Sequence, residues 1–186
     1  MELDNKIELL IENVVNYASE NKIGKIIIFA KQKENVLKLY NRIQKSSNFN
    51  EIKVLVTTFP MNQVLYMEGE NGDIEEVFPP LYDENERKAL KNIGIEVMSG
   101  TLPLDSVIIP GFDSSPFDVV KRTMNLFGEG IDLAIQSALM TTDAGLTIPG
   151  ERVISMNTAT FIDINTTNSR FLFHPEKKIV INSLFQ

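Results

Sequence analysis

The stretch LFGEGIDLAIQSALMTTDAGLTIP, Leu126–Pro149, decides how the fold is interpreted. Gly128 and Gly130 are expected to end a preceding helix, because glycine adopts the left-handed cap conformation at little cost. Ile131–Ile135 is short and apolar, so we expect a buried strand there. Ser137–Ala144 is rich in small residues, and we expect a helix that can approach another backbone or a ligand closely.

The composition fits a single globular domain over residues 1–186 and argues against several classes of protein. Hydrophobic residues make up 43% of the chain and charged residues 23%, as in ordinary globular proteins. The net charge of −7 argues against nucleic-acid binding, and the absence of cysteine excludes disulfides, zinc–thiolate sites and iron–sulfur clusters. No apolar run approaches the roughly 20 residues of a membrane span, and the N-terminus lacks the basic start of a signal peptide. We therefore expect a cytoplasmic protein with no membrane partner.

Outside the opening stretch, apolar periodicity predicts strands that alternate with helices. Helical spacing is found over residues 3–19, 36–43 and 83–93. Buried strands are predicted at Ile23–Ala30, Ile52–Phe59, Ile95–Ser99 and Arg152–Met156, with a final antiparallel pair at Arg170–His174 and Lys178–Ile181. This order predicts an α/β fold, namely a three-layer α/β/α sandwich with a mainly parallel mixed sheet and an antiparallel edge.

Three further segments have weaker patterns. Residues 60–82 contain three prolines and an Asn-Gly turn signal, so we expect a long loop that is functional or mobile. Leu104–Ile109 lies between two prolines, which favours a short edge strand. Ser114 is expected to cap a helix with Pro116 in its first turn. The buried side of that helix would carry Phe117, Val120, Met124 and Phe127.

Ligands of open α/β sheets bind beyond the carboxyl ends of the strands. The loops expected there, and the amino end of a helix near Ser137, carry hydroxyl and amide groups that suit phosphate or another small anion. We therefore predict a site for a small phosphorylated ligand. Its candidate residues are Lys31, Gln32, Lys33, Asn35, Thr57, Thr58, Ser99, Ser137, Thr141, Thr142, Asp143, Asn157, Thr158, Asn168 and Ser169. Each also has an ordinary structural explanation, because threonine favours strands, surface lysines are solvated and aspartate often caps helices.

No motif identifies a catalytic or metal site. Glycine-rich dinucleotide and phosphate loops are missing, and so is the GxSxG nucleophile motif. His174 is the only histidine, so no histidine pair exists to bind a metal. Catalytic residues therefore stay unassigned.

Several segments resemble the C-terminal domain of pyruvate kinase, and more closely the free-standing prokaryotic proteins that consist of this domain alone. They are LFG at 126–128, ALMTTDAGL at 138–146, ERVISMN at 151–157 and TTNSRFLFHP at 166–175. The resemblance covers most of the chain, from Ile23 onward, and implies a pyruvate kinase C-terminal-domain-like fold. It implies no kinase activity, because the kinase active site belongs to a barrel domain that this chain is too short to contain.

The resemblance also implies a ligand and an assembly. The family's C-terminal domain holds a sugar-phosphate site that includes its first βα loop, and its free-standing members look like binders of flavin mononucleotide. The matching loop here, Ala30–Asn35, lacks glycine and serine and carries Glu34, so we expect weaker phosphate binding. The family domain contributes to subunit contacts, so we expect a homodimer that uses Phe112, Phe117 and the tail Ser183–Phe185.

Three functions stay open at this point. The first is a small-molecule binding protein for a phosphorylated ligand, with flavin mononucleotide as one candidate cofactor. The second is an enzyme that uses this flavin or acts on a small phosphorylated substrate. The third is a ligand-free interaction protein with a decayed site.

Overall fold

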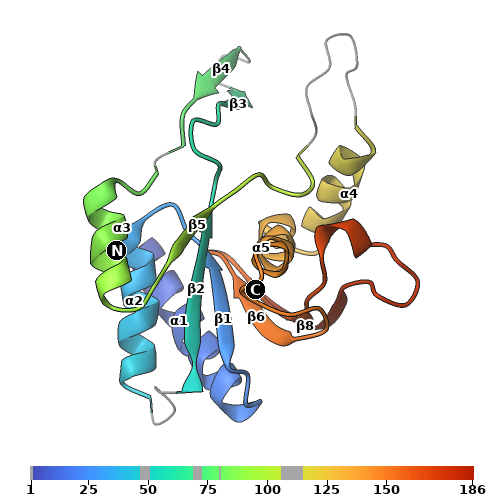
Figure 1. Cartoon of the computed structure of the whole chain (residues 1–186). Helices are drawn as coiled ribbons and strands as arrows, with labels where there is room; N and C mark the ends of the chain where they lie inside the picture. Colours follow the sequence, from blue (N-terminus) through green and yellow to red (C-terminus); the bar gives the residue numbers. More distant parts are fainter. Residues whose placement is uncertain (1, 47–50, 69–72, 80, 106–114) are drawn as a thin grey trace.

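A six-stranded mixed sheet forms the centre of the protein, in the order β5-β2-β1-β6-β7-β8 (Figure 1). The structure, a computed structural model, describes residues 2–46, 51–68, 73–79, 81–105 and 115–186. The strands are β1 (Lys25–Phe29), β2 (Lys53–Thr58), β5 (Val97–Ser99), β6 (Arg152–Met156), β7 (Phe161–Asn165) and β8 (Val180–Phe185). β5, β2, β1 and β6 pair in parallel, whereas β6–β7 and β7–β8 are antiparallel. The predicted parallel sheet with an antiparallel edge is confirmed.

Helices cover both faces of this sheet, as predicted for a three-layer sandwich (Figure 1). α1 (Glu2–Glu20), α2 (Lys33–Gln44) and α3 (Glu84–Asn92) lie on one face, and α5 (Ile131–Asp143) lies on the other with α4 (Pro116–Asn125) beside it. Ile26 and Ile28 of β1 pack in the core beneath α1 and α2, while Ile27 packs beneath α5. Burial on both faces explains why β1 is an uninterrupted apolar run. Within the described ranges, none of the helices has the length and apolarity needed to cross a membrane.

A strand over Ile131–Ile135 and a separate helix after it were expected, but the chain forms one helix from Ile131 to Asp143, so that prediction is wrong. Ile131–Ile135 is the first part of α5, which begins at Ile131 and not near Ser137. Gly130 is its N-cap, with a φ of 74° that glycine adopts readily. Nearly every residue from Ile131 to Thr142 is buried. A helix buried on all sides loses the amphipathic period that would distinguish it from a strand.

The C-terminal region also differs from the prediction. Arg170–His174 is not a strand; a short 3-10 helix, η2 (Ser169–Phe171), stands there and is followed by a turn. The antiparallel partner of β6 is instead β7, which the sequence reading missed. The fully buried Asp163 interrupts the apolar pattern of β7 and hides it. The last strand begins later than predicted, at Val180.

The segments with weak patterns have mixed outcomes. Residues 60–82 contain a hairpin of β3 (Leu65–Glu68) and β4 (Ile74–Val77) where only a loop was expected. The N-cap of α4 is Ser115, and the predicted cap Ser114 lies outside the described residues, as do residues 106–109 of the predicted edge strand. The stripe on α4 is only partly buried, because Phe117 is 44% exposed and Phe127 is 62% exposed.

Candidate functional site

The carboxyl ends of β1, β2, β5 and β6 lie at one edge of the sheet, as parallel pairing requires. We call this the carboxyl edge. The loops that follow these four strands were predicted to form the site, and all of them lie at the carboxyl edge. β7 runs in the opposite direction, and its last residue, Asn165, pairs with Arg152 at the start of β6. The segment Asn165–Ser169 therefore lies at the opposite edge, and its predicted place beside the loop that holds Lys31 is wrong.

α5 divides the predicted residues between the two edges. Its amino end is attached to the carboxyl edge, where Asn157 Nδ2 donates to Gly130 O at 2.7 Å. At its other end, Asp143 Oδ1 accepts hydrogen bonds from Asn168 Nδ2 at 3.2 Å and from Ser169 N at 3.0 Å. The predicted residues at the opposite edge are therefore Thr141, Thr142, Asp143, Asn168 and Ser169.

The buried threonines at the opposite edge bond to one another. Thr142 Oγ1 lies 2.7 Å from Thr166 Oγ1 and 2.9 Å from Thr147 Oγ1. Thr147 Oγ1 in turn donates to Thr141 Oγ1 at 3.3 Å. These hydroxyls are satisfied inside the fold, where they hold the end of α5 against the chain that follows β7.

Some predicted residues at the carboxyl edge also serve the fold. Thr57 Oγ1 donates to Ser137 Oγ at 2.8 Å, and both side chains are fully buried between β2 and α5. Asn157 Oδ1 accepts from the amides of Ala159 at 2.7 Å and Thr160 at 3.0 Å, which closes the β6–β7 turn. These groups already have partners. The place left for a ligand at the carboxyl edge is on the face of the sheet that α1, α2 and α3 cover, which we call the α2 side.

Two buried hydroxyl groups on the α2 side have no hydrogen-bond partner among the described residues, namely Thr58 Oγ1 and Tyr82 OH. Thr58 is 0% exposed and Tyr82 is 2% exposed. Thr58 ends β2 beside Ser99 of β5, and side-chain alternation puts it on the same face as Val56, which packs in the core with Tyr82. A buried hydroxyl without a partner costs roughly 1–3 kcal/mol, so these two groups call for an explanation.

Tyr82 keeps its proton at any physiological pH. Burial raises the pKa of its phenol, and the carboxylates of Glu86 and Glu34 raise it further, against a smaller opposing effect of Arg87. The phenol is therefore available as a hydrogen-bond donor. Thr58 was predicted from the sequence, but Tyr82 was missed, because an unpartnered hydroxyl is a tertiary property with no local signal.

Arg87 supplies positive charge beside these hydroxyls. Its guanidinium donates to Ser99 Oγ at 2.7 Å, to Val97 O at 3.1 Å and to Tyr82 O at 3.2 Å. All three acceptors are neutral, and no carboxylate in the described part of the chain forms an ion pair with Arg87. No local sequence signal marks Arg87, although the helix predicted over residues 83–93 is confirmed as α3, which begins with a capping box formed by Asp83 and Glu86.

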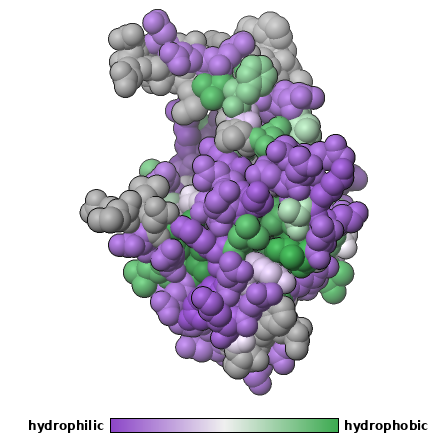
Figure 2. All heavy atoms as spheres, turned by 90° about the vertical axis from the view of Figure 1, so that its left-hand side faces the viewer, coloured by the Kyte–Doolittle hydropathy of each residue, from purple (hydrophilic) through white to green (hydrophobic). Residues whose placement is uncertain are grey.

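The amino end of α2 is the third feature of the α2 side. Its N-cap, Gln32, makes no side-chain hydrogen bond to the helix, so the first-turn amides have no side-chain cap. Two lysines flank this end. Lys31 Nζ lies 5.4 Å from the centre of the Phe59 ring, and Lys33 Nζ lies 3.4 Å from Glu86 Oε1. Seen from the side of α2 and α3, the surface is mainly hydrophilic, with apolar atoms in small areas (Figure 2).

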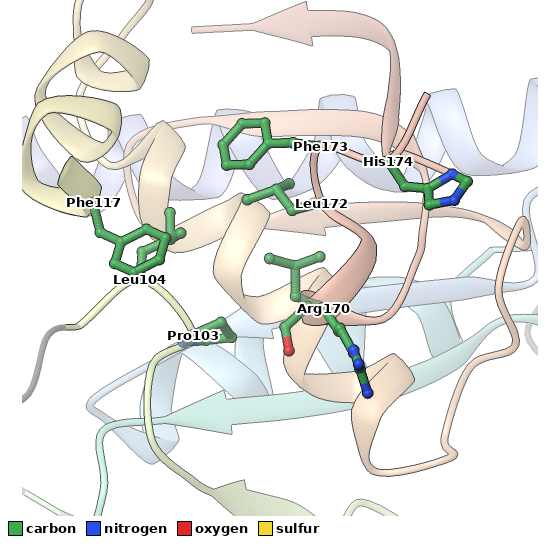
Figure 3. Close-up of a pocket in the computed structure, with 9 residues that line it drawn as sticks. Pro103, Leu104, Phe117, Arg170, Leu172, Phe173 and His174 are labelled. Atoms are coloured by element: carbon green, nitrogen blue, oxygen red, sulfur yellow. The ribbon is translucent and has the colours of Figure 1, made fainter. Parts of the chain in front are cut away.

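A separate hollow of about 490 Å³ lies between α4, α5 and η2 (Figure 3). Leu104 and Phe117 approach it from one side and Leu172 from the other, so its walls are mainly apolar. The polar ends of Arg170 and His174 point away from this apolar centre. The hollow therefore offers few groups that could orient an anion. Among the residues that the structure describes, no group of three or more acidic or histidine side chains could hold a metal ion.

Comparisons with known proteins assign no function. No protein-family model matches the sequence, and no curated protein matches it at a significant level.

Proposed function

We propose that this protein binds a small phosphorylated molecule at the carboxyl edge, on the α2 side of the sheet, and has no kinase activity. One observation carries the proposal: two buried hydroxyl groups without partners, Thr58 Oγ1 and Tyr82 OH, lie at the edge where α2 presents amides without a side-chain cap. All of these groups are hydrogen-bond donors, and an oxyanion is the acceptor that they lack.

A bound phosphate would receive several modest contributions. Each neutral hydrogen bond, such as one from Thr58 or Tyr82, contributes about 0.5–1.5 kcal/mol net. Lys31 and Lys33, which are at least partly exposed, contribute less than about 1 kcal/mol each. The carboxylates of Glu34 and Glu86 oppose an anion at this edge, which favours moderate affinity.

The resemblance to pyruvate kinase C-terminal-like domains makes flavin mononucleotide the first cofactor to test. Its phosphate fits the donors described above. Its ring needs an apolar contact, and the exposed side chain of Met61 lies beside Arg87, with Sδ 3.7 Å from Nη2. An enzyme that uses such a flavin is the second candidate function. Bleaching of the bound flavin by a nicotinamide cofactor would separate this enzyme from a simple binding protein.

The test is a calorimetric titration of flavin mononucleotide and of a sugar bisphosphate. Lys31→Ala combined with Lys33→Ala should weaken binding of either ligand about tenfold, from two lost charges of up to about 1 kcal/mol each. The matched control, Lys6→Ala with Lys45→Ala, removes two exposed charges elsewhere and should bind as the wild type does. Ser169→Ala should also have no effect, because Ser169 lies at the opposite edge.

Two results would count against this site. In the first, the wild-type protein binds neither ligand, which would favour an interaction protein with a decayed site. In the second, the Lys31 and Lys33 double variant binds as tightly as its control. That result would show that Lys31 and Lys33 do not contribute to binding. The loop between β1 and α2 would then supply no positive charge to the ligand.

A further inference from the structure

A larger groove, of about 710 Å³, lies at the opposite edge of the sheet. The turn before β6, the segment after β7, η2 and the turn before β8 form its walls. Its lining includes Asn165, Asn168, Phe171, Glu176, Lys177 and Lys178. Pockets that bind nucleotide-sized ligands have volumes of roughly 300–1,000 Å³, so the groove has room for one.

Hydrogen bonds hold the walls of this groove in place. Thr167 Oγ1 donates to Lys177 O at 2.6 Å, and Asn165 Nδ2 donates to Gly150 O at 3.0 Å. His174 Nδ1 accepts from the amides of Glu176 and Lys177, both at 3.2 Å, which fixes the turn that carries the lysines. The groove is thus organised before any ligand arrives, which lowers the entropy cost of binding.

The groove combines positive charge with an aromatic ring. Lys177 Nζ lies 5.4 Å from the centre of the half-buried Phe171 ring. In the part of the chain that the structure describes, neither Lys177 nor Lys178 forms an ion pair with a carboxylate. Among the described residues of the lining, Glu176 is the one acid, so their balance of charge is positive although the whole chain carries −7.

We propose that this groove is a second binding site, for a small molecule that carries a phosphate group and a planar ring, such as a nucleoside monophosphate. The phosphate would contact the ammonium groups of Lys177 and Lys178, and the ring would lie against Phe171. This site shares no residue with the carboxyl edge, so it does not depend on the function proposed there.

Equilibrium dialysis with radiolabelled adenosine monophosphate tests the site. The wild type should bind it, and Lys177→Gln with Lys178→Gln should weaken binding about tenfold, from two charges of up to about 1 kcal/mol each. The matched control Lys6→Gln with Lys45→Gln should stay within about twofold of the wild type. The wild type should also bind ribose 5-phosphate at least about fivefold more weakly than adenosine monophosphate, because an aromatic contact contributes about 1 kcal/mol.

Four outcomes would overturn the proposal. The first is no binding of adenosine monophosphate at millimolar concentration. The second is equal binding by the Lys177 and Lys178 variant and its control, with circular dichroism showing both folded. The third is equal affinity for ribose 5-phosphate, which would exclude the ring contact. If Lys31→Gln with Lys33→Gln alone abolished binding, the nucleotide would belong to the carboxyl edge, and the proposed function would stand without a second site.

Discussion

Replacing Thr58 by valine should stabilise the ligand-free protein and weaken binding of a phosphorylated ligand. Valine has nearly the shape of threonine, and Thr58 Oγ1 is fully buried with no partner among the described residues. Removing a buried hydroxyl of this kind relieves about 1–3 kcal/mol of desolvation cost. For a chain of this size, that corresponds to a rise in Tm of roughly 2–12 °C. The lost donor should weaken binding of a sugar bisphosphate by about two- to tenfold.

The neighbouring residue supplies a matched control. Thr57 is equally buried, but its hydroxyl donates to Ser137 Oγ at 2.8 Å. Thr57→Val should therefore destabilise the protein by about 0.5–1.5 kcal/mol, the opposite sign. Urea unfolding of the two ligand-free variants measures both effects. If Thr58→Val destabilises the protein as Thr57→Val does, or binds ligand as the wild type does, the hydroxyl of Thr58 does not contribute to ligand binding.

Three further predictions concern the fold and the assembly. Burial alone would raise the pKa of Asp163, but hydrogen bonds from Arg152 and its neighbours lower it. The stability that Asp163 contributes is therefore present above its unfolded pKa of about 3.9 and lost as pH falls through the lower folded value. Asp163→Asn should cost about 1.5–3 kcal/mol at pH 7 and flatten the acid limb of a stability–pH curve, and an unchanged limb would contradict this. Gly130→Ala should lower the free energy of unfolding in urea by about 2–4 kcal/mol, because φ is +74° and the new Cβ would lie 2.3 Å from Asn157 Nδ2. A neutral result would show that this turn rearranges freely. We also predict a homodimer in which Phe117 contributes to the contact, and Phe117→Lys on this 44% exposed side chain should shift light scattering towards monomer. A monomeric wild type would refute the assembly.

The parallel half of the sheet was predictable because strands buried on both faces are continuous apolar runs in the sequence. β1 and β2 are of this kind. α5 was misread for a related reason, since burial on all sides removes the helical period from Ile131–Ile135. β7 was hidden by Asp163, a buried charge whose partners come from α1, β6 and β8.

The candidate site was predictable only where chain order determines position. Parallel strands bring their carboxyl ends together, so Lys31, Thr58 and Ser99 were placed at the right edge. The direction of β7 depends on pairing between distant segments, which is why Asn168 was placed at the wrong edge. Tyr82 depends on burial created by the whole fold, and no local pattern marks it.

The most direct test of the central claim is an amide chemical-shift titration of isotope-labelled protein with a sugar bisphosphate. If the phosphate binds at the carboxyl edge, the largest shifts will fall on the first-turn amides of α2, Lys33–Asn35, and on Thr58 at the end of β2. Shifts in Asn165–Ser169, at the opposite edge, would report binding in the groove there and would not bear on this claim. A titration with no shift in α2, whether or not the opposite edge shifts, would contradict the claim that the carboxyl edge binds a phosphorylated ligand.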